Sequence, residues 1–184
     1  MAEYENNAVI RAILTRRTVR EYTDEPLSSA QLQTLLNCAM FAPSGRNSQP
    51  CVVRVLTDKT LLDRLNTDFK NKVGWDTPAY TRWDKNPVYQ NAPALFFIYA
   101  PTDARMEAGL MAENIAIGAK GLGLDSVIIG SVGALLEAPE GDEWKKILKV
   151  PEPYRFLISV AVGHGAEDPA PKPRKPEEFF VIEK

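Results

Sequence analysis

The first forty residues place apolar side chains at the spacing of amphipathic helices. One helix is predicted over residues 7–16, where apolar residues at i, i+1, i+4 and i+5 share a face: Val9, Ile10, Ile13 and Leu14. A second is predicted to start at Ser28 or Ser29, both good capping residues, with an apolar stripe of Leu32, Leu35, Leu36, Ala39 and Met40. Two amphipathic helices therefore open the chain.

Four shorter apolar runs have the length and composition of β-strands. They are predicted at residues 51–57, 94–100, 124–130 and 156–162. The run ALFFIYA at 94–100 has no polar position, so we expect it to be buried on both faces. Between the strands, the pattern predicts a helix capped by Asp58, one capped by Thr102 or Asp103, and a short one over 143–150.

The helix that contains residues 109–123 is apolar nearly all round. Its polar side chains are Glu113, Asn114 and Lys120, whereas a surface helix carries a broad polar face. We therefore expect this helix to be enclosed, either at the centre of the fold or against a second subunit.

Two segments show neither a helical nor a strand period. Residues 74–91 mix aromatic residues with Pro, Asp, Asn and Gly, which indicates either a surface loop anchored by its aromatics or a lid over a pocket. The candidate lid residues are Trp75, Tyr80 and Trp83. Residues 164–184 are rich in proline but end in four apolar residues, 179–182, so we expect this tail to dock on a partner subunit.

The order of elements indicates an α+β or α/β fold, with a small sheet sandwiched by helices. A length of 184 residues suits one domain over 1–184. Hydrophobic residues make up 45% and charged residues 25%, which excludes general disorder. No membrane span is expected, because the uncharged stretch at 26–45 is interrupted throughout by polar residues and proline. The net charge, 22 minus 24 or −2, argues against bulk nucleic-acid binding.

Histidine and cysteine are scarce, which limits the available chemistry. A single histidine, His164, excludes a multi-histidine metal site, and Cys38 and Cys51 cannot form a four-cysteine site within one chain, so no metal is expected. His164 lies between two glycines after a predicted strand, which favours an exposed turn over a catalytic role. Free cysteines and an N-terminus unlike a secretory signal predict a cytoplasmic protein.

Common nucleotide-binding and nucleophile motifs are absent from the sequence. There is no GKS or GKT, the GLGLDS run at 121–126 has Ser126 in place of the third glycine, and Ser44 has no GxSxG context. Since no acid–base or nucleophilic group stands out, an enzyme with this sequence would take its reactive group from a cofactor.

Two basic clusters suit a phosphate-bearing ligand. They consist of Arg16, Arg17, Thr18 and Arg20 at the end of the first helix, and of Lys172 and Arg174 in the tail. The first offers charge-assisted hydrogen bonds and a short hydroxyl donor, a combination that helix-dipole complementarity explains only in part. The alternative role of the second cluster is to keep the protein soluble. The two clusters could meet at one phosphate.

The loop APSGRNSQP at 42–50 supplies a third set of polar groups. Ser44, Asn47 and Gln49 provide a hydroxyl and two amides that match the donor and acceptor edge of a heteroaromatic ring. The alternative is an ordinary polar turn.

Taken in order, these motifs resemble the nitroreductase family of flavoproteins. The resemblance rests on RRTVREYTDEPL, APSGRNSQP, NAPALFFIYA, GLMAENIAIGAKGLGLDSVIIG, VAVGHG and KPRKPEEF, which cover nearly the whole chain. It implies an α+β fold with a small mixed sheet, an intertwined homodimer, and FMN in two equivalent interface pockets. It also implies ping-pong hydride transfer from NADH or NADPH, through flavin N5, to an electrophilic acceptor such as a nitroaromatic or a quinone.

The resemblance also assigns roles to individual positions. Contacts to the phosphate and ribityl chain fall on Arg16, Arg17, Thr18, Arg20, Lys172 and Arg174. Contacts to the flavin from the other subunit fall on Ser44, Asn47 and Gln49, and contacts along the isoalloxazine on Ile129, Gly130 and Ser131. No side chain is assigned a catalytic role, because flavin N5 carries the chemistry.

Two departures from the family pattern leave the reaction open. Cys51 stands where many relatives have an aromatic residue, and the turn IIGSVG lacks a glutamate that some larger relatives carry. The alternatives are a flavoenzyme of the same fold with another reaction (reductive dehalogenation, enone reduction or flavin-consuming chemistry) and a non-enzymatic dimer that binds a phosphate ligand.

Overall fold

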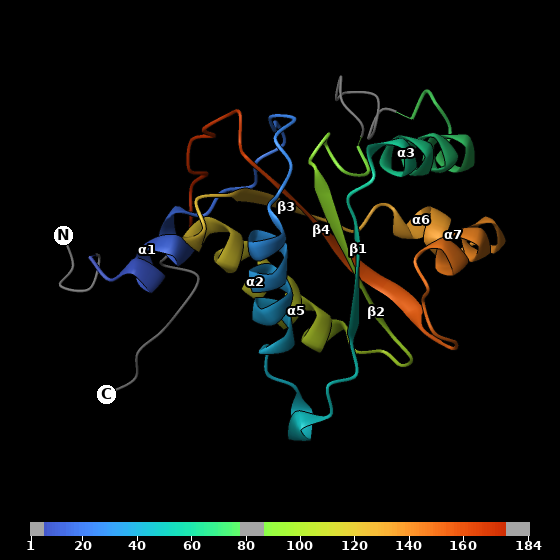
Figure 1. Cartoon of the computed structure of the whole chain (residues 1–184), viewed down its shortest axis with the longest axis horizontal. Coiled ribbons are helices and arrows are strands. Elements are labelled where there is room, and N and C mark those ends of the chain that lie inside the picture. Colours follow the sequence, from blue (N-terminus) through green and yellow to red (C-terminus); the bar gives the residue numbers. More distant parts are fainter. Residues whose placement is uncertain (1–5, 78–86, 176–184) are drawn as a thin grey trace.

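The chain folds around one four-stranded sheet with helices on both faces (Figure 1). A computed structural model describes residues 6–77 and 87–175. Its helices and 3-10 turns are α1 (Ala8–Thr15), α2 (Ser29–Met40), η1 (Gly45–Asn47), α3 (Lys59–Val73), α5 (Arg105–Gly121), α6 (Gly133–Leu136), η2 (Pro139–Gly141) and α7 (Asp142–Ile147). Its strands are β1 (Val52–Leu56), β2 (Ala94–Ala100), β3 (Asp125–Ile129) and β4 (Arg155–Gly163).

The strands lie in the order β1-β2-β4-β3, and each of the three pairings is antiparallel. Parallel pairing occurs, in the part of the chain that the structure describes, as a bridge between Thr18 and Ser126 at the outer edge of β3. Within residues 6–77 and 87–175, the mixed character expected of the sheet is therefore limited to that bridge, which brings the segment after α1 to the sheet.

The sheet separates two hydrophobic cores. Leu95, Phe97 and Tyr99 of β2 face a core shared with α3, α6 and α7. The alternate residues Phe96 and Ile98 face a second core shared with α2 and α5. Every residue of β2 is buried, as the uninterrupted apolar run predicts. The α+β architecture and the sandwiched sheet are thus confirmed.

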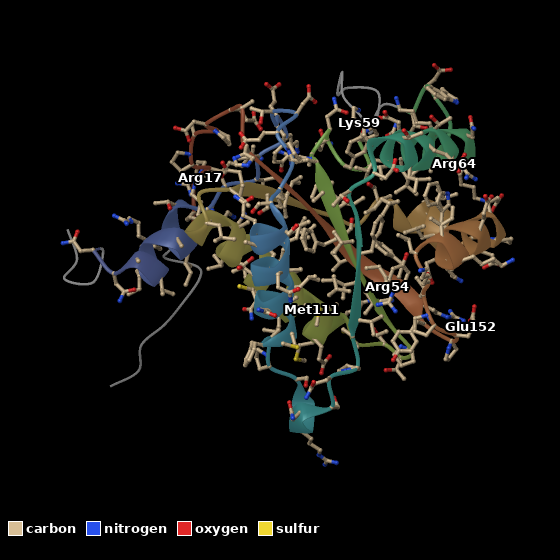
Figure 2. All side chains as sticks on the ribbon, viewed as in Figure 1. Arg17, Arg54, Lys59, Arg64, Met111 and Glu152 are labelled. Atoms are coloured by element: carbon tan, nitrogen blue, oxygen red, sulfur yellow. The ribbon has the colours of Figure 1, made fainter. Side chains whose placement is uncertain are left out.

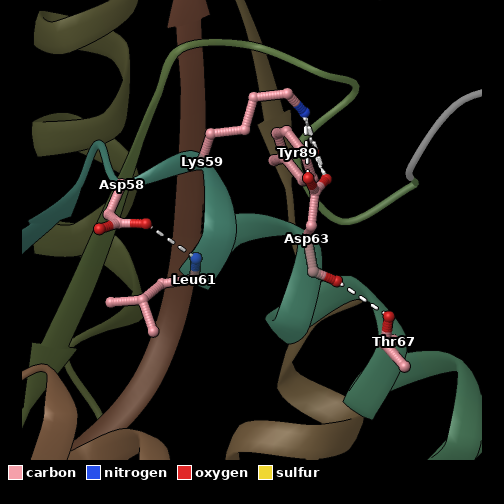
Figure 3. Close-up of polar contacts among 6 residues, drawn as sticks. All are labelled: Asp58, Lys59, Leu61, Asp63, Thr67 and Tyr89. Carbon is pink, nitrogen blue, oxygen red and sulfur yellow. Dashed lines mark hydrogen bonds and ion pairs between the residues drawn. The ribbon is translucent and has the colours of Figure 1, made fainter.

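A polar cluster at the start of α3 ties that helix to the turn before β2 (Figure 3). The carboxylate of Asp58 caps the helix, as predicted, by accepting the Leu61 N–H at 3.0 Å. Lys59 Nζ lies 3.1 Å from Asp63 Oδ2, and the hydroxyl of Tyr89 donates to Asp63 Oδ1. The Tyr89 hydroxyl, followed by Lys59, lowers the pKa of Asp63, so this carboxylate is charged and fully engaged at neutral pH.

The start of α5 differs from the prediction. A cap at Thr102 or Asp103 is wrong, because the N-cap position is Ala104 and no side chain caps the helix. The carboxylate of Asp103 instead lies 3.4 Å from the guanidinium of Arg105. The single turn of α6 was not predicted, since four residues are too few to display a helical period.

Part of the apolar surface of α1 and α5 is exposed in the single chain. One face of α5 is buried, yet Met106 is 76% exposed and Leu110 41%. No residue of α1 is buried, and Val9 is 61% exposed. The predicted enclosure of α5 is thus fulfilled on one side only. Among residues 6–77 and 87–175, no helix has the length and apolarity needed to cross a membrane.

Candidate functional site

Basic residues from both ends of the chain line one cavity of about 140 Å³. Its lining consists of Arg16, Arg17, Thr18 and Arg20 from the segment after α1, and of Pro169, Ala170, Lys172 and Arg174 from the tail. These residues carry five positive charges, and no carboxylate is among the described residues that line the cavity. We call it the cationic cavity. Its charge and size suit a phosphate-sized anion.

The end of α1 positions the first half of this cavity. The helix ends at Thr15, and the ψ of 135° at the next residue, Arg16, turns the chain into an extended path. Thr18 then bridges to Ser126, and the N–H of Val19 donates to the Ser126 carbonyl at 3.1 Å. Val19 itself is 1% exposed and anchors the path in the core. The arginines on either side of it are therefore held at the edge of β3 and remain accessible.

Tyr22 positions the second half of the cationic cavity, which the tail forms. It forms an antiparallel bridge with Gly165, which aligns the tail with the segment after α1. The ring is buried, its hydroxyl donates to the Val19 carbonyl at 2.6 Å, and burial raises the pKa of Tyr22 well above its ordinary value. Tyr22 is thus a neutral anchor beneath a charged surface.

The predicted loop residues lie elsewhere in the single chain. Ser44 and Gln49 line a second cavity of about 210 Å³ together with Met111 of α5, and we call it the loop cavity. The side chain of Gln49 donates to Asn47 Oδ1 at 3.0 Å, so the two amides engage each other. Figure 2 shows Arg17 and Met111, one from each cavity, well apart. The structure therefore does not bring this loop to the cationic cavity of the same chain.

The third predicted group lies where β3 ends. Ile129 is buried, and its carbonyl accepts a hydrogen bond from Ser159 Oγ at 2.7 Å. Gly130 is exposed and Ser131 half-buried. Gly130 lies four residues after Ser126, a distance of about 13 Å at 3.3 Å per residue. The outer edge of β3 therefore leads from the cationic cavity to this turn, a path that suits a long, flat ligand.

Of the candidate lid residues, Trp75 lies in the described part of the chain, and Tyr80 and Trp83 lie outside it. The indole N–H of Trp75 donates to Asn71 Oδ1 at 3.0 Å, and Lys70 Nζ lies 5.1 Å from the ring centre. These contacts hold the ring on α3, and its role as a lid stays a prediction.

Some neighbours of these cavities escaped sequence reasoning. Glu107 and Met111 of α5 line the loop cavity beside Cys51. Burial, followed by the negative charge of Glu107, raises the pKa of Cys51 to about 11. At the cationic cavity, Glu167 accepts a hydrogen bond from the backbone of Arg20. These contacts depend on tertiary packing and leave no periodic signal in the sequence.

The chain is similar to proteins of known family. The model of the nitroreductase family matches residues 13–164. FMN reductase [NAD(P)H] of Bacillus subtilis (strain 168) is 28% identical over 188 residues, which cover 94% of this chain and 72% of that protein. Iodotyrosine deiodinase of Thermotoga neapolitana is 27% identical over 181 residues, covering 91% and 92%. A solved nitroreductase with bound FMN from Desulfitobacterium hafniense DCB-2 is 25% identical, with a TM-score of 0.87 and coverage of 96% of this chain and 99% of that one.

Proposed function

This chain belongs to the nitroreductase family, and from that premise we propose that it is an FMN-dependent oxidoreductase. It would pass hydride from NADH or NADPH to an electrophilic small-molecule acceptor by a ping-pong mechanism. The observation that carries the proposal is the cationic cavity, in which residues from opposite ends of the chain face one small space.

The donors of this cavity fit the phosphate end of FMN. Arginine fits a phosphate through paired N–H donors, and lysine adds a point charge. Arg16, Arg17, Arg20, Lys172 and Arg174 would hold the phosphate, and Thr18 would reach the adjoining polyol. Along the edge of β3, Ile129, Gly130 and Ser131 would lie beside the ring system. The exposed Gly130 supports this assignment, because the absence of a side chain lets a flat ring approach the backbone.

A homodimer would complete the site. The loop with Ser44, Asn47 and Gln49 lies away from the cationic cavity of its own chain, so its amides would serve the cofactor of the partner. Met106 and Leu110 of α5 and Val9 of α1 are exposed apolar side chains, and apolar surface of this kind is typical of an interaction site. A second copy packed on this surface would also enclose the remaining face of α5.

The chemistry needs no acid, base or nucleophile from the protein. When bound, FMN supplies an N5 atom that accepts hydride from a nicotinamide and passes it to the acceptor. The residues of the chain would hold the ring in place, so that donor and acceptor stack on it in turn within reacting distance. The cationic side chains would add a positive field that favours the reduced, more negative state of the site.

Reductive dehalogenation is the second candidate. The matched deiodinase of Thermotoga neapolitana and this chain cover each other almost completely, whereas the FMN reductase of Bacillus subtilis is the longer protein. The choice between acceptors therefore stays open. A dimer that binds a phosphate ligand without catalysis is the third candidate.

The visible spectrum of the freshly purified protein is the direct test. We expect a flavin spectrum, present at once or after addition of FMN, that bleaches when NADH or NADPH is added without oxygen. A nitroaromatic, a quinone and a halophenol are then added separately, and the acceptor that restores the colour identifies the reaction. A colourless protein that does not bind added FMN would refute the proposal and favour the non-enzymatic alternative.

A further inference from the structure

The tail reaches the cationic cavity through a short antiparallel ladder. Two backbone hydrogen bonds form it and together make the bridge between Tyr22 and Gly165: the 2.9 Å bond from Thr23 N to the His164 carbonyl and the 2.7 Å bond from Ala166 N to the Glu21 carbonyl. The ladder covers the first residues of the tail. Lys172 and Arg174 lie several residues beyond it, where a further contact would help to direct the chain toward the cavity.

Glu167 supplies that contact. Its Oε1 accepts the backbone N–H of Arg20 at 2.5 Å, across 147 positions of sequence. It stands directly after Ala166 of the ladder and two residues before Pro169, the first residue of the tail that lines the cavity. Its carboxylate therefore fixes the point from which the tail enters the cavity.

The negative charge of Glu167 and its hydrogen bond to Arg20 have opposite effects on the binding of an anion in the cavity. A carboxylate beside an anion site weakens anion binding by Coulomb repulsion. Its hydrogen bond to Arg20 works in the opposite direction, because it holds the tail close to the arginines that follow α1. The two effects predict opposite results when the side chain is shortened.

We propose that Glu167 is a positioning residue for the phosphate of FMN. The proposal rests on the FMN site proposed above. By accepting the Arg20 N–H, Glu167 holds Lys172 and Arg174 opposite Arg16, and the phosphate affinity gained in this way exceeds the loss from its own negative charge.

The experiment measures the affinity of the full chain, freed of flavin, for FMN and for riboflavin by fluorescence quenching. Glu167→Ala removes the acceptor, Glu167→Asp keeps the charge but shortens the reach, and Glu167→Gln keeps an acceptor oxygen without the charge. Asp168→Ala is the matched control, because it removes the neighbouring exposed carboxylate, which has no hydrogen bond or ion pair within the described residues.

We expect Glu167→Ala and Glu167→Asp to bind FMN about tenfold more weakly, and Glu167→Gln to bind it nearly as well as the wild type. Riboflavin, which lacks the phosphate, should bind all variants alike. Asp168→Ala should bind FMN at least as well as the wild type.

Unchanged or tighter FMN binding by Glu167→Ala and Glu167→Asp would overturn the proposal, as would a Gln variant as weak as the Ala variant. Equal losses for riboflavin would also overturn it, because they would indicate a general disturbance of the fold. A wild-type protein that binds no FMN would instead overturn the proposed function itself.

Discussion

Removing one arginine from each side of the cationic cavity should weaken the binding of FMN through its phosphate and leave the binding of the rest of the flavin nearly unchanged. The double variant Arg16→Ala/Arg174→Ala takes one cation from the segment after α1 and one from the tail. Arg16 is partly buried, with a side-chain exposure of 25%, and lies 3.7 Å from the carboxylate of Glu113. It is thus held in place before any ligand binds.

The size of the effect follows from the contacts that are lost. A hydrogen bond to a charged group contributes about 1.5–3 kcal/mol, so two lost contacts cost about 3–6 kcal/mol if they act independently. That range weakens FMN binding by a factor of about 10² to 10⁴. Riboflavin has no phosphate, so its affinity should change little, and the affinities of the two flavins should converge in the double variant.

Fluorescence quenching of FMN and riboflavin by the full-length chain gives both affinities. Arg11→Ala is the matched control, because it removes an exposed cation of α1 that does not line the cavity. Tight FMN binding by the double variant, or an equal loss for riboflavin, would refute the assignment of the cavity to the phosphate.

Three further predictions concern packing and ionisation. Gly118→Ala places a Cβ 2.8 Å from Cys38 Sγ. The overpacking cost of about 1–3 kcal/mol should outweigh the helix-propensity gain of about 1 kcal/mol. Urea unfolding at fixed protein concentration should therefore show a lower free energy of unfolding, and this loss should shrink when Cys38→Ala is added. Ser159→Ala removes a buried hydroxyl donor and should lower the unfolding free energy by about 1–3 kcal/mol; an unchanged urea midpoint would contradict this. With a pKa of about 11, Cys51 should be thiolate to only about one part in a thousand at pH 8. Alkylation of Cys51, followed by peptide mass spectrometry, should therefore be slow at pH 8 and accelerate as the pH rises. Glu107→Gln should speed alkylation by lowering the pKa of Cys51, and fast labelling of the wild type at pH 8 would contradict the burial of the thiol.

The parts of the fold that sequence reasoning predicted are those set by local pattern. The strand at 94–100 was recognised because every position is apolar, and α3 was located because Asp58 is an efficient cap. The start of α5 was misplaced because Asp103 pairs with Arg105 rather than with the helix N-terminus. Competition between a salt bridge and a cap depends on side-chain geometry, which residue type alone does not specify.

The candidate site was predictable in composition but not in arrangement. Arginine, threonine and lysine clusters indicated a phosphate, and the structure brings those from the two ends of the chain into one cavity. The ladder that starts with Tyr22 and Gly165 was not predictable, since so short a pairing in a proline-rich segment has no alternating pattern. For the same reason Glu167 resembled an ordinary surface acid until its bond to Arg20 was seen.

The bond between Arg20 and Glu167 joins residues 147 positions apart, and this has a consequence for biosynthesis. A ribosome releases the first half of the cationic cavity early and the second half only after Arg174 has emerged from the exit tunnel. Both halves of the cavity are therefore present only after the chain has been translated through Arg174. Under the proposed function, tight binding of the FMN phosphate therefore follows translation of the tail.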